Sequence, residues 1–231
     1  MLSKAGNLRK QEAMLLSSSA NGKNVYRIGG ASFGLAGVFW LLNLIVLFTQ
    51  GQPPVEGQAF LDYVVKQRLA LQSAFLIFFV IDVLLVLGVT ALYVALKHSG
   101  TYFLFGSVLG VVAITIDLGN TVVTYAVLGL SSSYSVATNE AQRFAYGAAA
   151  EFARVIILDV GAPFFNILFS ISILAMSLTV LRTFGKSTGY LGILAGILGI
   201  VSGLLFLIPL LIPWAIWFLA VGYKLYKLPQ N

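Results

Sequence analysis

The stretch that decides the fold is YGAAAEFARVIILDVGAPFFNILFSISILAMSLTVLR, residues 146–182. It is apolar enough to cross a bilayer, yet three charged residues precede Pro163: Glu151, Arg154 and Asp159. Ionisable side chains in a membrane segment are costly, and they usually face the bundle interior and mark functional sites. Pro163 also removes the backbone hydrogen bond to the Asp159 carbonyl. We therefore expect a membrane-spanning helix that begins with a polar, bent portion.

The composition of the whole chain predicts further spans around this one. Of the 231 residues, 59% are hydrophobic and 10% are charged. The mean hydropathy of +0.94 excludes an ordinary soluble domain. Several apolar stretches reach the roughly 20 residues that a helix needs to cross about 30 Å of hydrocarbon. The sequence thus predicts an all-α, polytopic transmembrane helix bundle.

Six spans are expected within a transmembrane domain that covers residues 28–227. They are residues 28–49, 69–96, 101–130, 146–181, 189–206 and 209–224. As one straight helix the fourth span would be roughly 54 Å long, so we expect an interfacial piece up to about residue 158 before the crossing. Two prolines within residues 206–213 predict a hairpin. Trp214 and Trp217 are expected to be interfacial anchors of the last span.

The distribution of basic residues predicts the orientation. With six spans, both termini lie on one side, and that side collects ten Lys and Arg residues: Lys4, Arg9, Lys10, Lys23, Arg27, Lys97, Arg182, Lys186, Lys224 and Lys227. The other side has four, namely Lys66, Arg68, Arg143 and Arg154. The positive-inside rule then places both termini in the cytoplasm, with residues 1–27 as an N-terminal tail. We expect a prokaryotic cytoplasmic (inner) membrane protein.

Polar side chains from four spans are expected to share one depth. Counting about 1.5 Å per residue from the cytoplasmic end of each span places most of them roughly 21–22 Å in. They are Asn43, Asp82, Asp117 and Asn166, with Asn120 a little further out. No Lys, Arg or His shares this level. Three further residues are expected to form an outer vestibule: Glu151, Arg154 and Asp159.

Two interpretations of this polar layer remain open. In the structural one, Asp82 and Asp117 are protonated and hydrogen-bonded to the asparagines, which holds the helices together. In the functional one, the carboxylates form a proton, cation or organic-amine site that is reached from outside, because two acids without a matching base suit a cation. Arg154 with Asp159 is interpreted as an ion pair at the outer leaflet rather than a relay.

Catalysis and metal binding have little support in the sequence. The chain has no cysteine, and its single histidine, His98, falls in a short turn. It contains no HExxH pair, Walker loop, GxSxG elbow or DxxD-type phosphate motif. We therefore assign no catalytic residue, metal ligand or cofactor. Since the basic residues lie at the ends of spans, they indicate anionic lipid and topology rather than nucleic acid.

Four segments carry a resemblance to a known family. They are ALYVAL (91–96), RFAYGAAAE (143–151), FGKSTGYLGI (184–193) and WFLAVGYKL (217–225). With them the chain resembles a family of six-span prokaryotic membrane proteins that is catalogued as a domain of unknown function. The resemblance covers most of residues 25–228. It implies a six-helix membrane protein and no particular site residues.

Three functions are ranked from these observations. The first is a protein that binds or carries a small molecule, a cation or a lipid headgroup in an outward-opening polar chamber. The second is an accessory or structural subunit of a larger membrane complex, or a homo-oligomer, that docks through glycine-lined faces. Gly30 and Gly34 have the small-xxx-small spacing that lets two helices approach closely, which we expect to serve packing within the chain rather than a partner protein, and Gly192, Gly196, Gly199 and Gly203 follow one helix. An intramembrane enzyme ranks third. In every case membrane lipids are partners.

Overall fold

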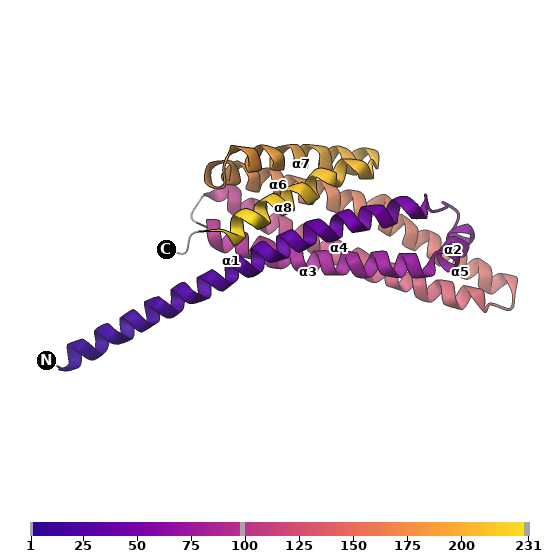
Figure 1. Ribbon diagram of the computed structural model, residues 1–231. Coiled ribbons are helices and arrows are strands. Elements are labelled where there is room, and N and C mark those ends of the chain that lie inside the picture. The colour runs from indigo at the N-terminus through magenta and orange to yellow at the C-terminus, as the bar shows by residue number, and fades with distance from the viewer. Residues whose placement is uncertain (1, 98–99, 229–231) are drawn as a thin grey trace.

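The computed structural model describes residues 2–97 and 100–228, with side chains from residue 24 onward, and over these ranges it contains helices and no strand. The all-α prediction is confirmed. In chain order the elements are α1 (Leu2–Gln50), α2 (Gly57–Lys66), α3 (Arg68–Leu96), α4 (Thr101–Ser135), α5 (Glu140–Arg154), the π-helical turn η1 (Val155–Gly161), α6 (Ala162–Thr183), α7 (Lys186–Leu205), the 3₁₀ turn η2 (Ile208–Leu211) and α8 (Ile212–Tyr226). Figure 1 shows them as one elongated bundle from which the start of α1 projects.

Six segments of the described chain are long and apolar enough to cross a membrane. They are Asn24–Gln50, Arg68–Leu96, Thr101–Ser135, Glu140–Thr183, Lys186–Leu205 and Ile208–Tyr226. Large apolar side chains on their outer faces are exposed, among them Ile45, Val122 and Leu204. So much exposed apolar surface is typical of helices that face lipid. The chain is a multi-pass membrane protein.

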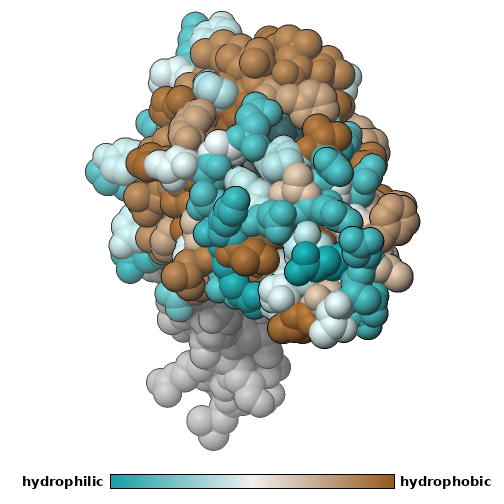
Figure 2. Space-filling view, turned by 90° about the vertical axis from the view of Figure 1, so that its right-hand side faces the viewer, coloured by the Kyte–Doolittle hydropathy of each residue, from teal (hydrophilic) through white to brown (hydrophobic). Residues whose placement is uncertain are grey.

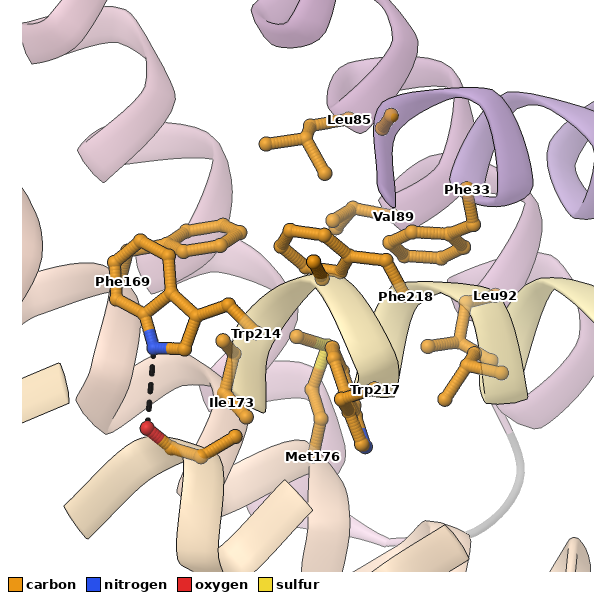
Figure 3. Close-up of a cluster of buried hydrophobic side chains, with 14 of the residues drawn as sticks. Phe33, Leu85, Val89, Leu92, Phe169, Ile173, Met176, Trp214, Trp217 and Phe218 are labelled. Atoms are coloured by element: carbon orange, nitrogen blue, oxygen red, sulfur yellow. Dashed lines mark hydrogen bonds between the residues drawn. The ribbon is translucent and has the colours of Figure 1, made fainter. Parts of the chain in front are cut away.

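The tightly packed half of the bundle is built around α8. Along the bundle α1 packs against α3 and α8, while α6 packs against α4 and α7. Figure 3 shows the aromatic core that results, in which Phe218 of α8 lies between Phe33 of α1 and Phe169 of α6, and Trp214 of α8 packs edge to face against Phe169. Trp214 and Trp217 are fully buried here. The expectation that these two tryptophans are interfacial anchors is therefore wrong.

A close approach of two backbones joins α1 to α8. A Cβ atom on Gly30 would lie 2.6 Å from the Tyr226 nitrogen and 2.7 Å from the Gly222 carbonyl oxygen. A Cβ on Gly222 would in turn lie 2.7 Å from the Gly30 carbonyl oxygen. By contrast, a Cβ on Gly34 would meet no atom within 4 Å. The predicted small-residue contact thus lies within this chain, and the glycine that permits it on the partner helix is Gly222.

The C-terminal hairpin is shorter than the other spans. α7 has 20 residues and α8 has 15. The chain reverses at Phe206–Leu207, where Phe206 adopts a left-handed conformation with φ of 56°. Pro209 and Pro213 stand in the first turns of η2 and α8, where a missing N–H costs nothing. The hairpin predicted from the two prolines is present.

The end of the bundle that is remote from both termini is closed by α2 and α5, as Figure 1 shows. The two helices touch at Gly57 and Gly147, since a Cβ on Gly57 would overlap the Gly147 carbonyl oxygen. The inner faces of both helices contribute to a second apolar cluster, which contains Phe60, Leu61 and Ala150. Figure 2 faces this end and shows hydrophilic residues gathered across its centre, with hydrophobic residues toward the margins. α2 and α5 thus form a water-facing cap over an apolar interior.

Candidate functional site

A cavity of about 280 Å³ lies under this cap. Its walls come from the second half of α1, the first half of α3, the middle of α4 and the start of α6, while α2, η1 and η2 contribute residues at its ends. Ligand-binding pockets usually measure about 300–1,000 Å³, so this cavity is near the lower end of that range. Its size suits a small molecule or one part of a lipid.

The cavity gathers four of the five residues of the predicted polar layer. Asn43 of α1, Asp117 and Asn120 of α4 and Asn166 of α6 all line it. Three separate spans therefore bring polar groups to one place, as the depth count predicts. Thr121 and Thr124 lie beside them on α4, but their hydroxyl groups donate to the Asp117 and Asn120 carbonyl oxygens one turn earlier. Asp117 and the three asparagines are thus joined in the wall by other polar side chains, among them Gln50 and Tyr63.

Asp82 differs from the other members of the layer because it does not line the cavity. Its side chain on α3 is only 1% exposed, and its Oδ2 atom has no hydrogen-bond partner among the described residues. It is close enough to Asp117 for the two carboxyl groups to interact electrostatically. Asp82 is therefore a buried member of the layer that does not contact the cavity directly.

Several buried polar atoms in the cavity wall have no hydrogen-bond partner among the described residues. They are Trp40 Nε1, Asn43 Oδ1, Gln50 Nε2 and Asn120 Nδ2. Buried polar groups in folded proteins are nearly always hydrogen-bonded, and leaving one unpaired costs about 1–3 kcal/mol. A ligand that supplies these hydrogen bonds would therefore bind more tightly than one that does not.

Aromatic side chains form much of the remaining wall, and the sequence analysis missed them. The six are Trp40, Phe60, Tyr63, Phe75, Phe78 and Phe165. A signal was available in the spacing, since residues three or four apart share a helix face. Trp40 precedes the cavity-lining Asn43 by three residues on α1, and Phe75 and Phe78 are themselves three residues apart on α3. An aromatic residue next to an intramembrane polar residue on one face thus identifies the wall.

The predicted ion pair between Arg154 and Asp159 is present outside the cavity. Arg154 Nη2 lies 2.9 Å from Asp159 Oδ2, and Nη1 lies 3.4 Å from Oδ1. The π-helical turn η1 explains this pairing, because its hydrogen bonds run over five residues and align side chains five apart. Glu151 is exposed to solvent. None of these three residues lines the cavity, whose wall here consists of Ile157, Leu158 and Ala162.

The π-helical turn η1 also packs closely against α4 at the level of the polar layer. The Ala162 N–H donates to the carbonyl oxygen of Ile157, five residues earlier, and Pro163 follows in the first turn of α6. A Cβ on Gly161 would overlap the side-chain amide of Asn120. Glycine at this position therefore lets η1 approach α4 and sets the place of the Asn120 side chain in the cavity.

Replacing Asp159 by asparagine is expected to lower the free energy of unfolding by about 1–2 kcal/mol. The Arg154 side chain is 9% exposed, so its charge would lose its partner while it stays buried. The cost stays below that of a fully buried pair because Asp159 is 46% exposed and water can replace part of its contribution. Thermal unfolding in mild detergent measures the change.

Glu151→Gln is the matched control for this prediction, because Glu151 is exposed and its side chain makes no hydrogen bond among the described residues. We expect its midpoint to equal that of the wild type. Equal midpoints for Asp159→Asn and Glu151→Gln would mean that the ion pair contributes nothing to stability.

Comparison of the chain with protein-family models, with curated proteins and with solved structures found no match. The class is defined by the fold itself: a multi-pass membrane protein whose helices enclose a cavity with a polar layer on one side.

Proposed function

We propose that this protein binds or carries a small molecule, a cation or a lipid headgroup in the cavity under α2 and α5. One observation carries the proposal: Asn43, Asp117, Asn120 and Asn166 converge from three spans on a cavity whose lining is largely apolar. Intramembrane polar residues that face a cavity usually mark a substrate or ion pathway. The buried, unpartnered atoms of Asn43 and Asn120 supply hydrogen-bonding capacity for such a ligand.

The proposal includes an orientation with the cavity toward the outside. The cavity lies at the end of the bundle that is remote from the N-terminus, under the hydrophilic cap. The excess of Lys and Arg at the opposite ends of the spans supports cytoplasmic termini in a prokaryotic inner membrane. Membership in the six-span family that the sequence resembles is part of the same proposal.

A native mass spectrum of the protein in mild detergent tests the proposal. We expect the wild type to carry a small molecule or a lipid, and the Asp82→Asn/Asp117→Asn double variant to lose it while remaining folded. The double variant removes both acids of the layer and leaves the size of the side chains unchanged. Asp62→Asn, on the exposed face of α2, is the matched control and should keep the ligand. An unchanged ligand in the double variant would overturn the proposal.

The alternative of an accessory subunit ranks second because the glycine faces are used within the chain. A Cβ on Gly192 would lie 2.8 Å from Trp217 Cδ1, and one on Gly203 would lie 3.0 Å from the Pro163 carbonyl oxygen. These glycines of α7 therefore pack against α8 and α6 and leave no free face for a partner. Other polypeptides that stay bound in the same mass spectrum, unaffected by the double variant, would favour the accessory role.

A further inference from the structure

The described part of the cavity wall contains an acidic residue and no basic one. Among the described residues that line it, Asp117 is the only charged one, and no lysine, arginine or histidine contributes. Asp82, buried on α3, adds a second carboxyl group that interacts electrostatically with Asp117. In a low-dielectric interior an unpaired carboxylate attracts a cation strongly and repels an anion. The wall therefore selects against anionic ligands.

The aromatic residues of the wall favour an organic cation over a metal ion as the ligand. Calcium and magnesium require several oxygen ligands, and the described residues contain no group of three or more His, Cys, Asp or Glu that could hold a metal. Aromatic ring faces attract cations within about 6 Å, and aromatic cages are the usual recognition element for quaternary ammonium groups. Trp40, Phe75 and Phe78 all face this cavity. Trp40 and Phe78 also pack edge to face, with ring centroids 5.8 Å apart.

A buried asparagine gives an independent indication of a ligand. Asn43 is 1% exposed, lines the cavity and leaves its Oδ1 atom without a hydrogen-bond partner among the described residues. It follows Trp40 by three residues, so the two side chains share one face of α1. A ligand that donates a hydrogen bond here, or presents the polarised C–H groups of an alkylammonium, would satisfy this oxygen.

From these observations we infer that the cavity recognises an organic ammonium group, with Asp117 as its counter-ion and Trp40, Phe75 and Phe78 around its apolar substituents. The inference rests on the proposed function and names its ligand class. The ammonium group belongs either to a free organic cation or to the headgroup of an amine-bearing lipid. A lipid phosphate would find no basic residue in the described wall, which favours the free cation.

Equilibrium dialysis of labelled benzyltrimethylammonium against the protein in maltoside detergent tests the inference. We expect saturable binding by the wild type, and binding at least tenfold weaker in Asp117→Asn. Asp62→Asn, which changes an exposed carboxylate on α2, should bind as the wild type does. Phe78→Leu should weaken binding about threefold to tenfold through the lost ring. Its neighbour Phe79 is 46% exposed outside the cavity, so Phe79→Leu is the matched control.

Competing ligands show whether the positive charge of the probe is recognised. They also show whether the ammonium group belongs to a lipid or to a free cation. Neopentylbenzene has the shape of the probe without its charge, and we expect it not to displace the probe. Displacement by phosphatidylethanolamine would assign the ammonium group to a lipid, whereas no displacement would assign it to a free cation. Equal displacement by the neutral isostere, or full binding by Asp117→Asn, would overturn the inference.

The dialysis also separates this inference from the proposed function. If benzyltrimethylammonium does not bind while the native mass spectrum contains another ligand that depends on Asp117, the ammonium inference is wrong and the proposed function stands. If neither experiment detects a ligand, both are wrong. Should Asp117→Asn fail to fold, the Phe78→Leu variant and the neutral competitor still decide the question.

Discussion

Gly222→Leu is expected to prevent the bundle from folding, and Gly222→Ala to lower the free energy of unfolding by about 3 kcal/mol. Even one added carbon at Gly222 would lie 2.7 Å from the Gly30 carbonyl oxygen and 2.8 Å from the Gly34 nitrogen. Both are backbone atoms, so no side-chain rotation relieves the overlap and α1 must move away from α8. Overpacking of this kind costs about 1–3 kcal/mol for a small group and more for a large one.

The yield of monodisperse protein on size exclusion and the thermal midpoint in detergent measure this effect. Gly34→Ala is the control, because its Cβ would meet no atom within 4 Å and alanine is the better helix former. We expect Gly34→Ala to match or slightly exceed the wild type. If Gly222→Ala behaved like Gly34→Ala, the close contact between α1 and α8 would be wrong.

Trp214→Ala is expected to destabilise the protein by about 3 kcal/mol. Trp214 is fully buried, and its ring centroid lies 5.2 Å from that of Phe169 and 5.5 Å from that of Trp40. Its Nε1 donates to the Ala195 carbonyl oxygen over 3.1 Å, as Figure 3 shows. Truncating a buried tryptophan costs about 3–5 kcal/mol in soluble proteins. We expect the lower value because lipid is itself apolar, so the loss is one of packing.

Two further variants of α8 separate the contributions to this loss. Trp214→Phe keeps an aromatic ring and removes the donor, so about 1 kcal/mol should be lost. Ile216→Ala changes a lipid-facing side chain that is 46% exposed, and its midpoint should stay within the error of the wild type. Equal losses for Trp214→Ala and Ile216→Ala would show that the aromatic core does not stabilise the bundle.

The length and position of the helices could be predicted from the sequence, but their rotation could not. Apolar stretches predicted where helices cross, and the prolines in the first turns of η2 and α8 predicted the hairpin. Trp214 and Trp217 were misjudged because the rule for interfacial aromatics uses residue type and position along a span. In a membrane both faces of a helix are apolar, so hydrophobic periodicity does not tell the face toward α1 and α6 from the face toward lipid.

One part of the candidate site could be predicted from the sequence, because it depends on depth along each span. The other part could not, because it depends on helix rotation. Depth is a one-dimensional property, and counting along each span was enough to bring Asn43, Asp117 and Asn166 together. Which of two neighbouring acids faces the cavity depends on helix rotation, so Asp82 was expected in the wall and lies behind it. The π-helical turn η1 ends at Gly161, which contacts Asn120 of another span, and local propensity does not encode such a long-range contact.

The short hairpin of α7 and α8 makes the hydrophobic girdle of this protein uneven. At about 1.5 Å per residue α7 is about 30 Å long, whereas the 29 residues of α3 reach about 44 Å. Annular lipids beside α7 and α8 therefore meet a span that matches a bilayer core of about 30 Å, whereas the longer α3 has to tilt or extend beyond that core. Because Ile208 and Leu211 at the hairpin tip belong to the cavity wall, the end of this short hairpin lies beside the cavity.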